Sequence, residues 1–346
     1  MWYRHPIALA ALIGSLSAAS AQAFRIEDVA SARNTSAGDL KPGTIAFSDK
    51  PADAAAGGNL NMVRFDDWAG KHPNEKKFLA LYPSYSEPTV RKAENGGKPE
   101  VEKLYMYVAQ ARFVLDRAPG SVDLAHDVTL DFLGRIDPAI KHKLIDAAEL
   151  TPLTDEAGTG NKNPDREWCT GRQSSICIQS TYQLEGKIPL GIMLVNKLRE
   201  SAKKISDHID FQSEFSARSA ADLDQAALQQ LTALDTPVAG ALEQDIFYVN
   251  QIMKFGKFLA VFQNHPSDPS RTVVTAFMAL AIKADVLDEK RGYERVPVLR
   301  NLVPADVLMG RSSFNSGSSI SAGLPQYARN EIKTVAGILE TDVAAK

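Results

Sequence analysis

The chain has 346 residues, 44% of them hydrophobic, and its 39 basic and 42 acidic residues give a formal net charge of −3. This near-neutral balance argues against a nucleic-acid-binding protein, because such proteins concentrate positive charge on one surface. The length and the apolar content suit one large domain or two modest ones, with a core of substantial size.

The first 23 residues have the composition of a secretory signal peptide. Arg4 provides a positive charge, residues 7–19 are an almost unbroken apolar run, and residues 21–23 (Ala-Gln-Ala) have the small-x-small pattern of a signal-peptidase site. The run is too short to span a bilayer as a helix. We therefore predict cleavage after Ala23 and a mature protein that is periplasmic or secreted. No later segment reaches 18 consecutive apolar residues, so we expect no integral membrane segment after processing.

Residues 24–75 are expected to form a poorly ordered arm or linker. Their middle part, residues 34–59, is rich in glycine, proline and alanine and contains few large apolar side chains. Such a stretch buries too little apolar surface to offset the entropy that is lost on ordering. We therefore expect a single α+β domain at residues 76–346.

The first elements of that domain combine strand-like and helix-like patterns. Residues 104–115 are rich in aromatic and β-branched side chains, which favours a strand, although a helix stays open. Residues 123–133 have apolar side chains at the spacing of one helical face. Asp137 followed by Pro138 is typical of a helix start, so we expect a second helix that extends through Ala148.

The chain contains two cysteines, Cys169 and Cys177, separated by seven residues. In an oxidising compartment, an even number of cysteines at close spacing predicts a disulfide. A redox pair is a weaker alternative, because such pairs usually have the spacing Cys-x-x-Cys. Zinc is weaker still, since two thiols supply half of a tetrahedral site.

Alternating polar and apolar residues predict two antiparallel strands, at residues 176–184 and 209–215. Between them, residues 190–204 have the apolar stripe of an amphipathic helix. Its basic face could lie on an anionic lipid surface, but Glu200 interrupts the positive charge, which favours packing on the core.

Residues 246–262 and 272–287 are two long strand-like runs, separated by a turn-forming octapeptide. They predict a long hairpin, with a bulge at Gly256. Large apolar side chains occur on both faces, so both faces need cover. Helices could cover both, or a cavity, a partner protein or a lipid could meet one of them. The candidate pocket residues are Tyr248, Phe255, Phe258, Phe277 and Met278.

Residues 310–323 form a serine-rich polar segment ahead of the final helix. Backbone amides in such a loop could hold an anion or a carbonyl group, although a surface connection is favoured. The candidate polar residues are Ser313, Asn315 and Ser318. Pro325 is then expected to open a final helix with an apolar stripe.

The order of these elements predicts an α+β fold, with an antiparallel sheet packed on helices, because the strands do not alternate regularly with helices. The order resembles a helix-grip arrangement, in which a curved antiparallel sheet wraps the last helix and leaves a cavity. This resemblance rests on element order alone and implies no function.

The sequence contains no established catalytic motif. The histidines lack metal-binding spacing, and the nucleophile elbow, the phosphate-binding loop and the dinucleotide fingerprint are absent. His126 and His142 have aspartates near them in sequence, which could orient a general base, but solvated helix faces give the same pattern and are favoured. We therefore expect no metal and no cofactor.

Three functions remain open, in decreasing order of preference. The first is an exported, non-enzymatic protein that binds or carries a hydrophobic small molecule or a lipid. The second is a structural or assembly factor of the cell envelope, which would use the loose arm and an exposed sheet edge to bind another protein. The third is an exported hydrolase with a non-standard site around His126, His142 and the serine-rich loop.

Overall fold

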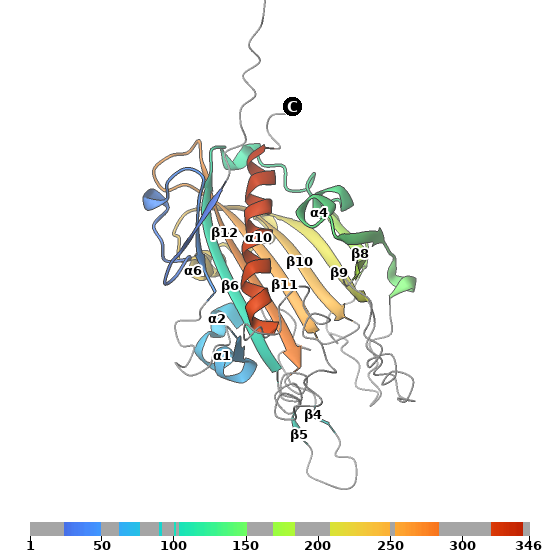
Figure 1. The fold of residues 1–346 in the computed structure, drawn as a ribbon. Coiled ribbons are helices and arrows are strands. Elements are labelled where there is room, and N and C mark those ends of the chain that lie inside the picture. Colours follow the sequence, from blue (N-terminus) through green and yellow to red (C-terminus); the bar gives the residue numbers. More distant parts are fainter. Residues whose placement is uncertain are drawn as a thin grey trace, which may run out of the picture.

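One large sheet dominates the molecule (Figure 1). A computed structural model describes residues 24–49, 62–76, 90–91, 100–101, 104–150, 169–183, 208–249, 253–283 and 320–341. Ten strands of these segments form a sheet in the order β1-β2-β6-β12-β11-β10-β9-β8-β7, and β3 also pairs with β6. The paired strands of this sheet are antiparallel, except for the parallel pair β1 and β2.

The strands differ in length between the centre and the edges of the sheet. The strands of the sheet are β1 (Arg25–Asp28), β2 (Thr44–Ser48), β3 (Met62–Arg64), β6 (Leu104–Leu115), β7 (Ile140–Leu144), β8 (Ser175–Gln183), β9 (His208–Ser219), β10 (Val238–Val249), β11 (Met253–Asn264) and β12 (Thr272–Lys283). A separate two-stranded sheet consists of β4 (Val90–Arg91) and β5 (Glu100–Val101). The long central strands form the floor on which the helices pack.

The helices lie on both faces of the large sheet. They are α1 (Phe65–Lys71), α2 (Pro73–Glu75), α4 (Leu130–Ile136), α6 (Gln225–Thr232) and α10 (Ile320–Thr341). Short 3-10 helices occur at Ala37–Asp39, Pro119–Ser121, Ala147–Glu149 and Ala220–Asp222. Helix α10 packs on β6 and α4 on one face, and buried side chains of α1 and α6 pack on the other (Figure 1).

The period-two pattern of the strands produces two apolar cores. Along β12, Val274, Ala276 and Met278 belong to the core beneath α10, whereas the alternate residues Phe277 and Ala279 belong to the core beneath α1 and α6. Burying an aromatic or branched side chain stabilises the fold by about 1.5–3 kcal/mol. The expected α+β fold is confirmed, and α10 lies along the sheet as in the helix-grip arrangement.

The strand predictions are largely confirmed. Leu104–Leu115 is the strand β6, and the runs at 176–184 and 209–215 correspond to β8 and β9. The expected hairpin is β11 and β12, but the run at 246–262 is divided between two strands, β10 and β11. No glycine or proline marks this division in the sequence.

Gly256 serves a close approach between side chains, not the expected bulge. The register shift between β11 and β12 falls between Met253 and Phe255. A Cβ atom at Gly256 would lie 2.9 Å from Leu280 Cδ2 and 3.2 Å from Ile246 Cδ1. A larger residue at this position would therefore require the Leu280 and Ile246 side chains to move.

The helix predictions around Asp137 need correction. Helix α4 begins at Leu130, where Thr129 Oγ1 accepts a hydrogen bond from Phe132 N at 3.1 Å. The second helix expected from Asp137 is wrong, because Asp137 ends α4 and its Oδ1 accepts from Ala139 N at 3.0 Å in a turn. The following residues form the strand β7, whose alternating apolar and lysine residues have the period of a strand.

The expected poorly ordered arm needs correction for its described part. Strand β1 pairs with β2, and β2 pairs with the central strand β6. Phe24 is buried, and its ring meets that of Phe113 edge-on at 5.7 Å. Short apolar runs inside a glycine- and proline-rich stretch can therefore form strands when an existing sheet edge supplies hydrogen-bond partners. The expected signal peptide (1–23) and residues 50–61 lie outside the described residues.

Helix α10 begins five residues before the position expected from the sequence. Pro325 lies inside the helix, where its missing N–H removes one hydrogen bond near the helix start. Arg329 anchors α10 to the N-terminal strands: it donates to Asp28 Oδ1 at 2.6 Å, lies 3.6 Å from Asp49 Oδ2, and stacks over the Phe47 ring at 4.6 Å from its centroid. The two ends of the described chain are therefore joined on one face.

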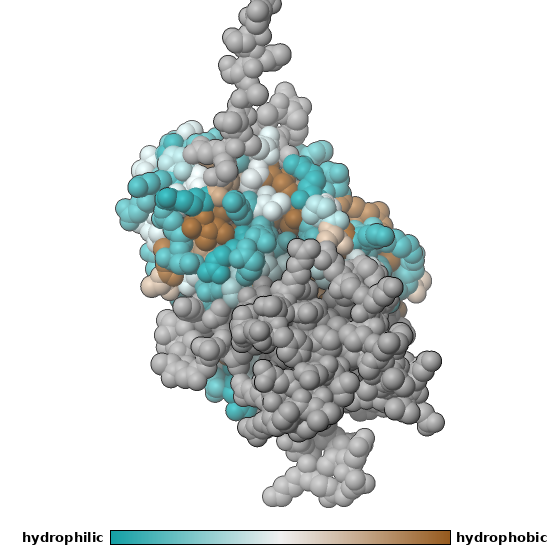
Figure 2. Space-filling model, viewed as in Figure 1, coloured by the Kyte–Doolittle hydropathy of each residue, from teal (hydrophilic) through white to brown (hydrophobic). Residues whose placement is uncertain are grey.

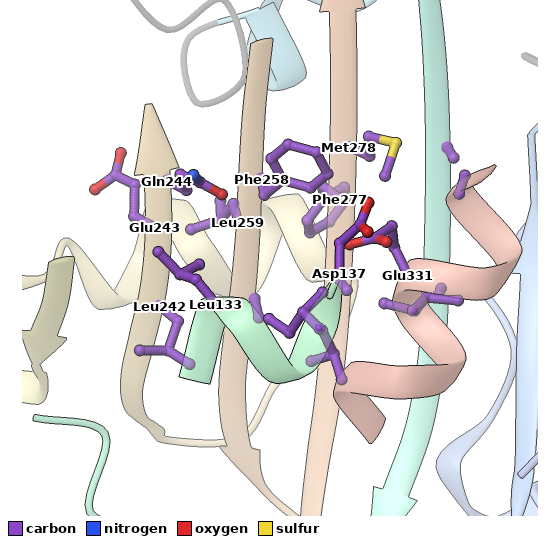
Figure 3. A pocket seen from close by; sticks show the side chains of 18 of the residues that line it. Leu133, Asp137, Leu242, Glu243, Gln244, Phe258, Leu259, Phe277, Met278 and Glu331 are labelled. Atoms are coloured by element: carbon purple, nitrogen blue, oxygen red, sulfur yellow. The ribbon is translucent and has the colours of Figure 1, made fainter. Parts of the chain in front are cut away.

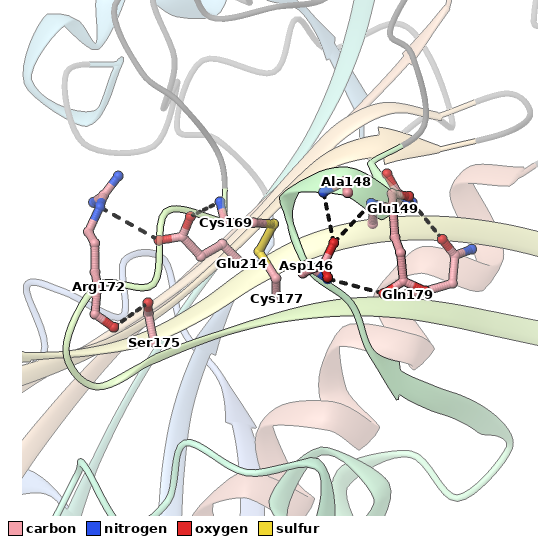
Figure 4. The surroundings of a disulfide bond; sticks show 10 residues. Asp146, Ala148, Glu149, Cys169, Arg172, Ser175, Cys177, Gln179 and Glu214 are labelled. Carbon is pink, nitrogen blue, oxygen red and sulfur yellow. Dashed lines mark hydrogen bonds and ion pairs between the residues drawn. A yellow bond between two sulfur atoms is a disulfide. The ribbon is translucent and has the colours of Figure 1, made fainter.

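The expected disulfide is present between Cys169 and Cys177, with a Cα–Cα distance of 5.5 Å (Figure 4). Glu214 lies beside it and accepts a hydrogen bond from Cys169 N at 3.4 Å. The bridge closes a short turn into β8, on the face of the sheet that α10 does not cover. The amphipathic helix expected at 190–204 lies outside the described residues, as do residues 310–319 of the polar segment expected at 310–323. Residues 320–323 of that segment belong to α10 instead.

Candidate functional site

A cavity of about 140 Å³ lies between the sheet and α10 (Figure 3). Its floor comes from β6, β9, β10, β11 and β12, and its walls come from α4, β7 and α10. The lining is largely aliphatic and aromatic, with a few polar side chains that include Gln244, Asp137 and Glu331. This combination is typical of sites that bind small apolar molecules.

A row of small side chains explains why this space is not filled. Strand register places Ala260 opposite Ala276 and Ala276 opposite Ala111, so that three alanines lie side by side across three strands. Leu242 and Phe47 end the row on either side. All five residues line the cavity. Because an alanine side chain stops at Cβ, the helix that crosses this row cannot contact its floor everywhere.

A second row of larger side chains borders the alanine row. Met278 pairs with Phe258, Phe258 pairs with Gln244, and Gln244 pairs with Phe215. The Phe215 ring stacks on Phe132 of α4 at 5.9 Å between ring centroids. These residues line the cavity and connect its floor to its wall.

Helix α10 contributes the roof of the cavity. Tyr327, Ala328, Glu331, Ile332 and Val335 line it, at the spacing of one helical face. The opposite face of α10 carries Arg329, which holds the helix on the N-terminal strands. The helix is therefore positioned from one side and leaves its other side to the cavity.

The lining includes the carboxyl groups of Asp137 and Glu331. Asp137 follows α4, and Figure 3 shows its carboxyl group and that of Glu331 directed toward each other. Burial, followed by the nearby charge of Asp137, raises the pKa of Glu331 to about 8. Glu331 is therefore largely a neutral acid at pH 7.

Two further polar groups lie beside these carboxyl groups. Burial raises the pKa of the Tyr327 hydroxyl well above its usual value, with smaller contributions from Glu331, Asp137 and Tyr182. Burial lowers the pKa of His142, against the opposing effects of Asp137 and the Leu133 carbonyl. Both groups are thus uncharged at neutral pH.

A serine on the neighbouring strand positions the His142 ring. Its Nδ1 lies 2.9 Å from Ser180 Oγ, on the neighbouring strand β8. Its Nε2 is buried and makes no hydrogen bond with the described residues. Nε2 is a donor in one tautomer of the ring and an acceptor in the other.

The structure divides the five candidate pocket residues between the two cores. Phe258, Phe277 and Met278 line the cavity, although the Phe277 side chain belongs to the opposite core. Tyr248 and Phe255 pack only in that opposite core. The serine-rich candidates Ser313, Asn315 and Ser318 lie outside the described residues.

The histidine pair that motivated the hydrolase hypothesis is not assembled as a site. His142 lines the cavity, whereas His126 lies in an exposed turn that does not. Ser180, the hydroxyl beside His142, is fully buried in β8 and does not line the cavity. A substrate in the cavity therefore meets the imidazole but not this hydroxyl.

Sequence reasoning missed the alanine row and the pair Asp137 and Glu331. The alanines carry no motif, and only strand register shows that they are neighbours. The carboxyl groups come from distant parts of the chain. A signal was available only for Glu331, which lies one helical turn from Tyr327 and Val335 on the apolar stripe of the last helix.

Two other features, a metal site and a membrane-spanning helix, concern the described segments. In this part of the chain, no group of three His, Cys, Asp or Glu side chains is arranged to hold a metal ion. Among the same residues, no helix has the length and apolar character needed to cross a membrane.

The chain matches no protein-family model and no curated protein sequence. Solved structures to which it is similar include the ZhuI aromatase/cyclase from Streptomyces sp. R1128 (12% identity, 69% of this chain and 97% of that chain, TM-score 0.32). Others are Ara h 8.0201 (11%, 68% and 97%, TM-score 0.28) and norcoclaurine synthase from Thalictrum flavum in complex with dopamine and hydroxybenzaldehyde (9%, 74% and 98%, TM-score 0.29). These likenesses are too distant to transfer a function.

Proposed function

We propose that this protein is an exported, non-enzymatic binding or carrier protein for a hydrophobic small molecule or part of a lipid. The observation that carries the proposal is the cavity over Ala111, Ala260 and Ala276. Well-packed cores leave few voids larger than a water molecule, because empty space forfeits contacts. An apolar ligand would restore those contacts.

The cavity volume limits what can be fully enclosed. About 140 Å³ is close to the size of an engineered cavity that stays dry and binds benzene. The buried part of the ligand would thus be a single ring or a short alkyl segment. A longer lipid chain would have to extend beyond the described walls.

Export is part of the proposal and has its own test. The apolar run and the Ala-Gln-Ala site of residues 1–23 support it. The disulfide between Cys169 and Cys177 also suits an oxidising compartment. Cell fractionation followed by N-terminal sequencing should recover a mature protein that starts at Phe24. Full-length protein with free thiols in the cytosol would contradict export.

Binding is tested by filling the space. Purified protein should release an apolar compound on solvent extraction, detectable by mass spectrometry, or should bind small apolar probes such as benzene or hexane. Ala276→Leu should reduce probe affinity at least about tenfold, because the added atoms occupy the ligand's volume. Tyr248→Phe is the matched control, since Tyr248 packs in the opposite core, and it should bind as the wild type does. Equal binding by wild type and Ala276→Leu would overturn the proposal.

A further inference from the structure

The half-buried carboxyl groups of Asp137 and Glu331 differ from buried carboxylates of the described chain. Glu75 pairs with Arg33 at 2.9 Å, and Asp245 pairs with Lys257 at 3.0 Å. Within the segments that the structure describes, neither Asp137 nor Glu331 has an ion pair with a basic side chain. The cavity therefore contains two acidic groups whose charge no described basic side chain balances.

An unbalanced pair of this kind is costly in apolar surroundings. Removing a carboxylate from water disfavours its charged form, and a second carboxylate nearby disfavours it further. The raised pKa of Glu331 reports both effects. The empty site thus keeps one proton that a cation could replace.

The neighbouring polar groups favour a ligand that donates hydrogen bonds. Asp137 and Glu331 direct their carboxyl groups toward each other at this part of the cavity. An ammonium group carries a positive charge and several N–H donors, and it therefore fits this carboxyl pair. A carboxylate ligand would instead add a third negative charge.

We propose that the cavity binds an apolar amine, with its ammonium group between Asp137 and Glu331 and its apolar body over Ala111, Ala260 and Ala276. This inference rests on the proposed binding function and specifies its ligand class. At pH 7 the ammonium displaces the Glu331 proton to solvent, so that about one proton is released for each ligand bound, and fewer are released at pH 9. The bound ammonium is then held by two carboxylates.

The proposal fixes the pH dependence of binding. The groups that face Glu331 are Asp137 after α4, His142 on β7 and Tyr327 on α10, with Tyr182 on β8 behind Tyr327. The lowered pKa of His142 and the raised pKa of Tyr327 keep both uncharged between pH 7 and 9. An alkylamine stays protonated there, as lysine does. Amine affinity should therefore rise up to about tenfold from pH 7 to 9, as Glu331 loses its proton.

The test compares three probes with the same apolar chain: n-hexylamine, 1-hexanol and hexanoate, by isothermal titration calorimetry. We expect hexylamine to bind at least about tenfold more tightly than hexanol at pH 9, and hexanoate to bind most weakly. Hexanol should bind less tightly at pH 9 than at pH 7, because neutral Glu331 can donate to its oxygen and ionised Glu331 cannot. Equal affinity for hexylamine and hexanol at pH 9 would overturn the amine proposal while keeping apolar binding. No binding of any probe would instead contradict the proposed function.

Substitutions of the two carboxyl groups test whether they form the amine-binding site. Glu331→Gln and Asp137→Asn should each reduce hexylamine affinity at pH 9 by about tenfold or more, with little effect on hexanol. Glu340→Gln is the control, since Glu340 is a partly buried carboxyl of the same helix that contacts Asp116 N at 3.3 Å and does not line the cavity. An equal loss with Glu340→Gln would overturn the assignment. If a variant fails to fold, the wild-type comparison of hexylamine with hexanol still decides the proposal.

Discussion

The two faces of the sheet handle buried charge in opposite ways. On the face turned away from α10, Lys257 is fully buried and forms ion pairs with Glu243 and with Asp245, the latter at 3.0 Å. Although burial alone would lower it, these two carboxylates raise the pKa of Lys257. On the face beneath α10, no basic side chain of the described segments pairs with Asp137 or Glu331.

The faces also differ in how completely they are packed. Phe255 and Phe247 are fully buried on the face turned away from α10. The Phe255 ring meets that of Phe65 of α1 edge-on, at 6.5 Å between ring centroids. Three alanines occupy the corresponding centre of the face beneath α10. The comparison teaches that one sheet can combine a filled face whose buried charges are paired with an incompletely filled, acidic face, which is the face of the proposed binding site.

The largest expected effect comes from removing the buried cation Lys257 on the face turned away from α10. Lys257→Met should destabilise the protein by about 3–5 kcal/mol, because it leaves buried carboxylates without their cation. Urea unfolding followed by circular dichroism measures this loss. Lys143→Met removes an exposed partner of Glu149 and serves as the control, with no measurable change expected. If Lys257→Met were as stable as the control, buried neutralisation would not distinguish the faces.

A smaller effect of opposite sign is expected at the acidic face. The pKa of Glu331 is about 8 in the folded protein and close to 4.3 in an unfolded chain, so the folded state loses stability as the pH rises between these values. Glu331→Gln removes this loss and should be more stable than the wild type at pH 8, by roughly 2–3 kcal/mol after allowance for partial exposure.

The measurement for this second comparison is the free energy of unfolding of both proteins at pH 5 and pH 8. The difference between variant and wild type should grow with pH and should stop growing above pH 8. A constant difference would show that Glu331 does not titrate in this range. Glu340→Gln on the same helix should show a smaller change in the same direction, because burial also raises the pKa of Glu340.

The smallest expected effect compares two alanines of β12 that point to opposite faces. Ala276 lines the cavity, whereas Ala279 is fully buried in the filled core. Ala279→Leu should cost about 1–3 kcal/mol through overpacking, and Ala276→Leu should cost less than about 1 kcal/mol, because its added atoms enter existing space. Thermal unfolding of the two variants gives the difference. Equal losses would mean that the cavity cannot accept a side chain.

Sequence patterns predicted the parts of the fold that depend on local periodicity. Alternation identified β8 and β9, and cysteine spacing identified the disulfide. Local signals failed at Asp137, where a helix-starting dipeptide ends a helix instead. They also failed at β1 and β2, whose order depends on pairing with a sheet edge that the sequence does not place.

The candidate site was less accessible to sequence reasoning for the same physical reason. Large residues such as Phe258 and Met278 attract attention in a sequence, and both line the cavity. The space itself comes from Ala260, Ala276 and Ala111, and their adjacency follows from register across strands far apart in the chain. Small residues become informative only once their neighbours are known.

The anchoring of α10 by Arg329 has a consequence for biogenesis. Its partners Asp28 and Asp49 precede every strand of the cavity floor in the chain, whereas the helix follows them all. During synthesis, the floor must therefore wait, with its apolar face uncovered, until the helix emerges to close it. During that interval the nascent protein would most need a chaperone, and a ligand could enter the cavity without displacing α10.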